Sequence, residues 1–192
     1  MVDRMRKLVY STSLSLDGYI DSDGGDPSWV VPDEELHRHF NDVERQVDTL
    51  LYGRRMYELM AGYWPTADKD PAAPSSIVEY AQIWRPVAKV VFSSTLERVD
   101  WNSRLVRGDP VAEVSSLKAQ AGGSMGVGGL VLASTLASAG LIDEYRLYYV
   151  PFLLGSGNAV FSQIQERVRL NPVETRVFSS GTTLIRCIPV TA

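Results

Sequence analysis

The chain has 192 residues, of which 45% are hydrophobic and 22% are charged, and its formal net charge is -4. This composition is that of an ordinary globular protein, so the length predicts a single domain over residues 1–192, and the acidic balance excludes a strongly basic nucleic-acid binder. A lone cysteine, Cys187, excludes an internal disulfide, and without a secretory signal pattern we expect a cytoplasmic protein.

The first predicted element is a strand. Residues 7–20 alternate larger apolar side chains with small polar ones, which indicates a strand buried mainly on one side, and they include the turn signal Asp17-Gly18. Residues 21–32 have the composition of a loop that contains Trp29. A large aromatic residue in a loop packs either on the core or on a ligand, and we assign Trp29 to a ligand.

Residues 33–47 form the first predicted helix, with apolar side chains at helical spacing. Glu34 and Glu35 lie in its first turn, where acidic residues favour the helix dipole without needing a chemical role. His37 and His39 are two positions apart and point to different sides of the helix, which excludes an i, i+4 metal pair. We expect both histidines at the surface.

A short strand at 48–52 leads into a second helix that starts with Gly53, Arg54 and Arg55. The helix dipole disfavours positive charge at this end, and the first acidic residue comes only at Glu58. Either an anion lies over the helix start and is neutralised by the arginines, or both side chains extend into water. We favour anion binding.

The middle of the chain begins with a loop at 61–76 that is rich in proline and alanine. The elements predicted after it are a helix at 77–84, a strand at 87–92, a short strand within 99–106 and a helix at 110–120. The strand at 87–92 ends in Ser93 and Ser94, whose hydroxyls can cap the next element or hold phosphate oxygens.

The stretch 124–150 carries the strongest signal. A short apolar run precedes Gly128 and Gly129, and a helical pattern follows as far as Gly140, where a left-handed C-terminal cap falls. A strand pattern covers 142–150. Strand, glycine turn and helix together can present backbone N–H groups to a phosphate at close approach. The alternative is an ordinary tight connection, since the spacing is not G-x-G-x-x-G.

The chain closes with a flexible loop at 151–161 and a predicted hairpin at 174–188. The uncharged run at 119–142 is rich in Gly, Ser and Thr, which argues against a membrane span.

Alternating strands and helices closed by a hairpin predict an α/β fold, with a mostly parallel sheet that carries antiparallel strands at its C-terminal edge.

Four blocks of this sequence resemble the dihydrofolate reductase-like superfamily, and the likeness covers nearly the whole chain. The blocks are S-L-S-L-D-G-Y-I at 13–20, the G-R-R-x-Y-E helix start at 53–58, the Ser93-Ser94 strand end, and the stretch 128–161 from the glycine pair through G-L-I-D-E to P-x-x-L-G-x-G-x-x-x-F. Their order and spacing are most similar to the reductase domain of bacterial riboflavin biosynthesis, the C-terminal domain of a bifunctional deaminase-reductase. The resemblance implies a three-layer α/β/α fold with NADPH extended across the carboxyl ends of the strands.

The resemblance also implies which residues bind the cofactor. Arg54 would meet the adenosine-side phosphate, while Ser93 and Ser94 match positions near the 2′-phosphate, which favours NADP over NAD. Gly128 and Gly129 match a glycine pair beside the pyrophosphate that is often joined by a cis peptide. The full set is Ser13 and Ile20 beside the nicotinamide, then Gly53, Arg54, Arg55, Ser93, Ser94, Gly128 and Gly129, with Leu130 and Val131 as N–H donors.

For the substrate, the resemblance implies contacts from Asp17 and Trp29 and a carboxylate in the first helix as the catalytic acid. Alignment on the tryptophan and the following proline gives Glu34 without a gap and Glu35 with one inserted residue, and helical phase does not decide between them. If neither acid reaches the pocket, we would not expect folate as the substrate, and the proton would come from water or another group.

The expected function is that of an NADPH-dependent reductase that transfers hydride to a small heterocycle of the pterin or aminopyrimidine kind. It would be similar to dihydrofolate reductase or 5-amino-6-(5-phosphoribosylamino)uracil reductase. The alternatives are a non-catalytic NADP-binding or assembly module that retains the fold, and a flavin-using member. The expected partners are a small-molecule substrate and, as in relatives of the family, a second copy in a homodimer. We expect no nucleic acid, membrane or metal partner.

Overall fold

The structure is a computed structural model that describes residues 5–21, 29–162, 164 and 167–190, so the predicted loop at 21–32 lies largely outside it. Its strands are β1 (Leu8–Ser15), β2 (Val47–Gly53), β3 (Ala88–Phe92), β4 (Ser103–Val106), β5 (Ser124–Gly128), β6 (Glu144–Val150), β7 (Leu170–Val177) and β8 (Thr183–Pro189). Its helices are α1 (Glu34–Glu44), α2 (Arg54–Tyr63), α3 (Ser75–Trp84), α4 (Pro110–Lys118) and α5 (Leu130–Ser138), with a 3-10 turn, η1, at Ala67–Lys69.

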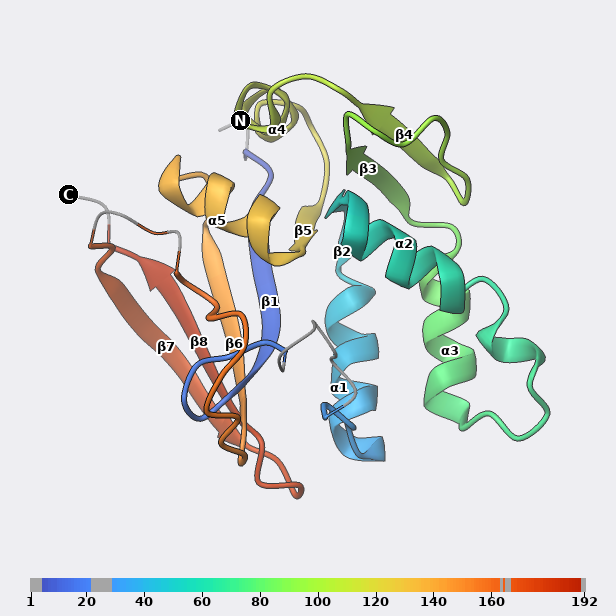
Figure 1. Ribbon diagram of the computed structural model, residues 1–192, viewed down its shortest axis with the longest axis vertical. Coiled ribbons are helices and arrows are strands. Elements are labelled where there is room, and N and C mark those ends of the chain that lie inside the picture. The colour runs from blue at the N-terminus through green and yellow to red at the C-terminus, as the bar shows by residue number, and fades with distance from the viewer. Residues whose placement is uncertain (1–4, 22–28, 163, 165–166, 191–192) are drawn as a thin grey trace.

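All these strands belong to one sheet, in the order β4-β3-β2-β5-β1-β6-β8-β7 (Figure 1). Strands β1 to β6 run parallel, while β8 is antiparallel to both β6 and β7. The C-terminal hairpin is therefore confirmed, and it is longer than the sequence pattern indicated. The predicted α/β fold, with a parallel centre and antiparallel C-terminal strands, is confirmed with it.

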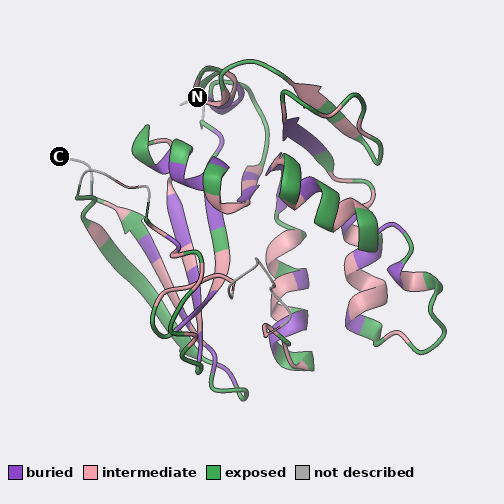
Figure 2. Cartoon of the chain, in the orientation of Figure 1, coloured by how far each residue is buried: buried purple, intermediate pink, exposed green. Residues whose placement is uncertain are grey.

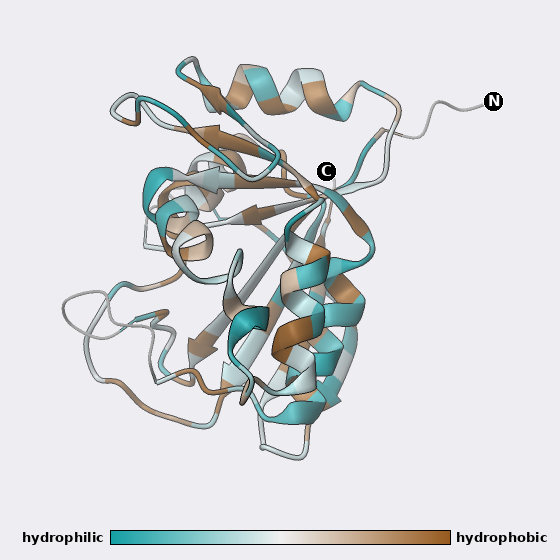
Figure 3. Cartoon of the chain, turned by 90° about the vertical axis from the view of Figure 1, so that its right-hand side faces the viewer, coloured by the Kyte–Doolittle hydropathy of each residue, from teal (hydrophilic) through white to brown (hydrophobic). Residues whose placement is uncertain are grey.

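Helices cover both faces of the sheet and make three layers. Helices α4 and α5 pack on one face, where Leu136 joins a core cluster with Leu8 of β1. The other face is covered by α2 and α3 around Tyr52 and Trp84, and by α1 through Leu36. The helices carry alternating hydrophobic and hydrophilic bands, as helices with one buried side should (Figure 3). We call the two sides of the sheet the α4–α5 face and the α1–α3 face.

Strand β1 is buried mainly on its α4–α5 face, as predicted, but both of its ends are also buried on the α1–α3 face. Leu8 and Val9 point to opposite faces, yet their exposed fractions are 0% and 5%. The reason is the parallel sheet, because its crossover connections place helices on both sides. Ser11, on the α1–α3 face, is nevertheless exposed in the middle of the sheet. The edge strand β7 is exposed over most of its length (Figure 2).

The loop predicted at 61–76 is shorter than expected. Helix α2 continues to Tyr63, η1 follows, and α3 begins at Ser75. Ala67 is buried, and Arg85 donates to Asp68 at 2.5 Å, so the segment is fastened to the end of α3. Among the described residues, no helix is both long and apolar enough to cross a bilayer.

A buried ammonium group fastens α3 to the sheet. Lys89 of β3 is 1% exposed, and its Nζ donates to the carbonyl oxygens of Trp84 at 2.6 Å, Val87 at 2.8 Å and Trp101 at 3.1 Å. The same Nζ lies 3.9 Å from the centre of the Trp84 ring. A cation at a helix C-terminus is favourable, because it satisfies the last carbonyls and opposes the dipole. Lys89 therefore holds the C-terminal end of α3 against β3.

We expect Lys89→Met to lower the free energy of unfolding by about 3 kcal/mol, because three buried carbonyl groups lose a charged donor. Urea unfolding followed by circular dichroism measures the change. The matched control is Lys69→Met, which removes a charge from an exposed position in η1 and should leave the stability nearly unchanged. Equal losses in the two variants would contradict this role of Lys89.

Candidate functional site

Strand register brings four separate turns to one edge of the sheet. In the parallel ladders, Tyr52 pairs with Gly128, Gly53 with Phe92, and Phe92 with Val106. These strands therefore end level with one another. The residues that follow them along this edge are Arg54 after β2, Gly129 after β5, Ser93 after β3 and Arg107 after β4.

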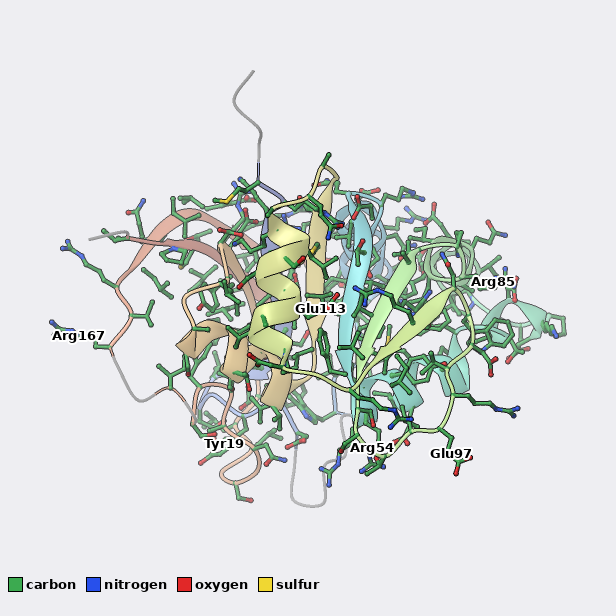
Figure 4. The ribbon with its side chains drawn as sticks, turned by 90° about the horizontal axis from the view of Figure 1, so that it is seen from above. Tyr19, Arg54, Arg85, Glu97, Glu113 and Arg167 are labelled. Atoms are coloured by element: carbon green, nitrogen blue, oxygen red, sulfur yellow. The ribbon has the colours of Figure 1, made fainter. Side chains whose placement is uncertain are left out.

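A hollow of about 420 Å³ lies at this edge. Its lining residues come from the start of α2 and from the turns after β3 and β4, and they are Arg54, Phe92, Ser93, Ser94, Thr95, Val106, Arg107, Gly108 and Pro110. Figure 4 shows Arg54 at the edge towards which β3 and β4 converge. The structure thus brings three of the predicted phosphate-binding residues, Arg54, Ser93 and Ser94, into one place.

Hydrogen bonds hold the wall of the hollow in place. Arg107 donates from Nη1 to the Ser94 carbonyl at 2.9 Å and from Nη2 to the Leu96 carbonyl at 2.6 Å. The Ser93 hydroxyl accepts from the Leu96 N–H at 3.0 Å and so caps the turn. Capping was one of the two uses predicted for this hydroxyl. Arg54 reaches Glu58 only at 3.4 Å, one turn along α2.

The hollow is positively charged. Arg54 and Arg107 line it, and among the described residues of its lining none is acidic. Both arginines are exposed, so their charges are available to a ligand. Two guanidinium groups beside several hydroxyls suit a phosphate dianion, which takes charge-assisted hydrogen bonds from both. Sequence reasoning missed Arg107, although its position directly after a predicted strand was a usable signal. Arg55 is also exposed in the first turn of α2, but it does not line the hollow.

The glycine pair is closely packed, so a larger residue at either position would force a neighbour to shift. A Cβ on Gly128 would lie 2.9 Å from Cε1 of Tyr52, and one on Gly129 would lie 3.2 Å from Cβ of Met56. Gly129 has a φ of 96°, which favours glycine. The described residues contain no cis peptide bond, so the cis Gly128–Gly129 link that the family resemblance implied is wrong for this structure.

The start of α5 faces the start of α2. A Cβ on Gly53 would come within 4.0 Å of Cβ of Leu132 in the first turn of α5. Both helices begin at a glycine N-cap that offers no side-chain cap, so their first N–H groups are left for water or a ligand. Leu130 and Val131 are the first residues of α5, and Val131 is 65% exposed. Two helix starts thus converge where an anion would be favoured.

Asp17 links two loops rather than standing free. Its carboxylate accepts from the Ser15 hydroxyl at 2.6 Å and from the N–H groups of Gly155 at 2.7 Å and Leu154 at 3.1 Å. The Ser15 hydroxyl, followed by the Gly155 N–H, lowers the pKa of Asp17 to about 2. The N–H of Ile20 donates to Asn158 at 3.0 Å in the same loop pair. The substrate-binding role of Asp17 stays a prediction.

The carboxylates of Glu34 and Glu35 are held by neighbouring side chains. Glu34 accepts from the Ser76 hydroxyl at 2.8 Å, which lowers its pKa. Glu35 accepts from the Ser179 hydroxyl at 2.6 Å and from Arg176 at 3.0 Å, and the Ser179 hydroxyl is the largest cause that lowers its pKa to about 2. Both groups are therefore ionised at neutral pH. Their catalytic role stays a prediction.

Two remaining residues of the predicted site lie near the interior. Ser13 is half-buried on the α1–α3 face of β1. The indole Nε1 of Trp29 is buried and has no hydrogen-bond partner among the described residues.

The prediction that His37 lies at the surface is wrong, because it is 8% exposed and packs edge-on against Trp64 and Tyr80. Helical spacing alone could not show that α3 would cover this side of α1.

Comparison with known proteins gives consistent results. The profile of the RibD C-terminal domain matches residues 6–184. The uncharacterized protein YyaP of Bacillus subtilis is 32% identical over 186 residues, which are 95% of this chain and 94% of YyaP.

Two solved structures are similar in fold. The diaminohydroxyphosphoribosylaminopyrimidine deaminase/5-amino-6-(5-phosphoribosylamino)uracil reductase of Thermotoga maritima superposes with a TM-score of 0.68 at 17% identity, over 97% of this chain and 57% of that one. Dihydrofolate reductase of Enterococcus faecalis, complexed with NADP(H) and RAB-propyl, superposes with a TM-score of 0.65 at 18% identity, over 96% and 97% of the two chains. At these identities the likeness shows the fold alone.

We expect Gly129→Ala to lower the free energy of unfolding by about 1–3 kcal/mol, because a positive φ and a close methyl contact both oppose it. The matched control is Gly62→Ala near the end of α2, where the added methyl meets nothing within 4 Å. That change should raise stability by up to about 1 kcal/mol through helix propensity. Urea unfolding of both variants checks the pair, and a stabilised Gly129→Ala protein would contradict the packing described.

Proposed function

The chain belongs to the family of the RibD C-terminal domain, and we propose that it works as an NADPH-dependent reductase that transfers hydride to a small heterocycle. The observation that carries the proposal is the positively charged hollow beside Arg54 and Arg107. A dinucleotide with an additional phosphate on its adenosine ribose needs such a site at one end. A nicotinamide dinucleotide without that phosphate gains nothing from two cations there.

The residues present fit this cofactor. Arg54 and Arg107 would take the 2′-phosphate, with the Ser94 hydroxyl beside them. The starts of α2 and α5 would take the pyrophosphate through their N–H groups, since Gly128 and Gly129 allow the backbone to approach it closely. Ser13 and Ile20 would flank the nicotinamide. When bound, NADPH supplies the hydride, and the protein contributes orientation and exclusion of water.

The substrate would lie on the α1–α3 face beside the nicotinamide, where Ser11 of β1 is exposed and Ser13 half-buried. A pterin or an aminopyrimidine is the class that we infer from the family. The reaction adds a proton as well as a hydride. Glu34, Glu35 and ordered water are the sources that the sequence left open, and because hydrogen bonds lower the pKa of both acids, water is favoured over them.

We also infer that two copies associate. The edge strand β7 presents exposed apolar side chains, among them Val173 at 42% and Val177 at 67%, along a sheet edge that pairs with no further strand among the described residues. An edge of this kind offers backbone hydrogen bonds to a second chain. Light scattering on the purified protein would give the mass of a dimer if this inference holds.

We expect Arg54→Gln and Arg107→Gln each to weaken NADPH binding by about tenfold to a hundredfold, because each removes a charge-assisted contact to a phosphate. NADH binding should change little, since NADH has no 2′-phosphate. Isothermal titration calorimetry with both cofactors measures the difference. The control is Arg45→Gln. This arginine pairs with Asp42 and Glu79 just before β2 begins, whereas Arg54 follows the other end of β2.

Two outcomes decide between the proposal and its alternatives. Equal losses for NADPH and NADH in both variants, or no NADPH binding by the unmodified protein at millimolar concentration, would contradict the cofactor site. Selective NADPH binding without NADPH oxidation across a panel of pterins and aminopyrimidines would favour the non-catalytic module that retains the fold.

A further inference from the structure

Strand β7 has a symmetric sequence along its open side. Residues 173–177 read V-E-T-R-V, so Thr175 has an acid on one side, a base on the other and a valine beyond each. Every residue of the strand after Leu170 is exposed (Figure 2). Within the described chain β7 has only β8 as a neighbour, and it forms the outer edge of the sheet in Figure 1. The other side of the strand is therefore free to pair with a further strand.

Backbone groups point to this free side at alternate residues. The Phe178 N–H donates to the Thr182 carbonyl at 2.9 Å, and the register with β8 is regular over 174–177. Because hydrogen-bonded and non-hydrogen-bonded positions alternate in an antiparallel ladder, Thr175 and Val177 turn their N–H and C=O groups away from β8. A strand that pairs with this edge would take its hydrogen bonds from these two residues.

The ladder that this edge can form is short. Pro172 has no N–H group, and the register with β8 shifts between Pro172 and Glu174. A bulge of this kind bends the strand and disrupts further pairing. Such an edge suits a single partner strand rather than open-ended addition of strands. A second copy of this chain meets that condition, because a two-fold axis lets both copies use the same strand and closes the assembly.

Charge selects the register of such a pair. In a symmetric antiparallel pair, one residue lies on the two-fold axis opposite its own copy. If Glu174 or Arg176 lay there, two like charges would face each other, which is destabilising. If Val177 lay there, little more than the end of the strand would pair. With Thr175 on the axis, Glu174 faces Arg176 of the partner subunit, and this favourable pair occurs twice.

Both charged side chains are available to a partner. Glu174 approaches Arg186 at 3.0 Å, and Arg176 donates to Glu35 at 3.0 Å, yet the two side chains remain 41% and 44% exposed. Each can therefore contact a second copy without leaving the pair in its own chain. Val177 is 67% exposed and would be covered beside the new ion pair.

We propose that two copies of this chain join through β7 in an antiparallel pair centred on Thr175, with Glu174 of each copy opposite Arg176 of the other. The two sheets then continue into one another across the two-fold axis. The inference rests on the association of two copies inferred above and gives that association its register. It does not depend on the cofactor site.

The test reverses the two charges one at a time. Sedimentation velocity over a range of concentrations measures the dissociation constant of the dimer. Glu174→Arg and Arg176→Glu should each raise this constant about tenfold or more, because two favourable pairs become two repulsive ones. In an equimolar mixture of the two variants, with one of them fluorescently labelled, acid faces base again at both positions. The mixture should form a heterodimer within about threefold of the affinity of the unmodified dimer.

The matched control is Arg167→Glu, which reverses a charge that lies before β7 and points away from the molecule (Figure 4), so the dissociation constant should not change. A second variant, Thr175→Pro, removes the N–H at the centre of the pair but no bond to β8, and should give a folded monomer. Circular dichroism checks that each variant folds.

Three results would overturn the proposed register: a dimer that both charge reversals leave unchanged, a mixture of the two variants without heterodimer, and a folded Thr175→Pro protein that remains dimeric. An unmodified chain that is monomeric at millimolar concentration would overturn the association as well. NADPH binding by the unmodified chain is measured separately, so a failure of the cofactor site is distinguishable from each of these results.

Discussion

The register of the parallel strands is the constraint on which the rest of the site depends. Gly53 is level with Phe92 and Val106, and Gly128 is level with Tyr52, one residue earlier, although these residues are far apart in the sequence. The turns that follow these strands therefore lie at the same edge of the sheet, and two of them lead directly into the helices α2 and α5. Because helix starts carry partial positive charge, the edge favours an anion before any side chain is considered. Arg54 and Arg107 then add two full charges at one end of it.

The carboxylates of the chain divide into two groups by what surrounds them. Glu34 and Glu35 have hydroxyl, guanidinium or N–H donors around them, and these donors stabilise the ionised form. Glu44 is enclosed by Tyr52, Tyr80 and the sheet, so burial outweighs its few polar contacts and favours the protonated form. At neutral pH Glu44 is therefore partly protonated, whereas Glu34 and Glu35 are ionised. Glu44 interacts with Tyr80 of α3 from the last turn of α1, whereas Glu34 and Glu35 lie in the exposed first turn of the same helix.

Much of the fold follows from the sequence because its signals are local. The glycine pair, Gly140 with its φ of 67°, and the hairpin are all set by turn chemistry and alternation. The dipole argument likewise predicted an anion at Arg54, and the structure places Arg54 beside a hollow with a second arginine. Burial that depends on packing between distant elements could not be read in this way. His37 is covered by α3, and Glu44 is enclosed by α3 and the sheet, neither of which is visible in the spacing of α1. Arg107 directly follows a predicted strand, which was a usable signal, but the pairing of that strand with β3, which brings Arg107 beside Ser93, depends on sheet order and not on local sequence.

The hydrogen bonds of Asp17 have a consequence for motion. One carboxylate holds the turn at the end of β1 to the backbone of Leu154 and Gly155, and the N–H of Ile20 adds a second tie. Because the pKa of Asp17 in the folded chain is about 2, below its ordinary value of 3.8, this stabilisation is complete above pH 3.8 and is lost only as the pH falls towards 2. The two loops are therefore coupled across the physiological range. We therefore expect the turn after β1 and the loop at Leu154 and Gly155 to move together rather than independently.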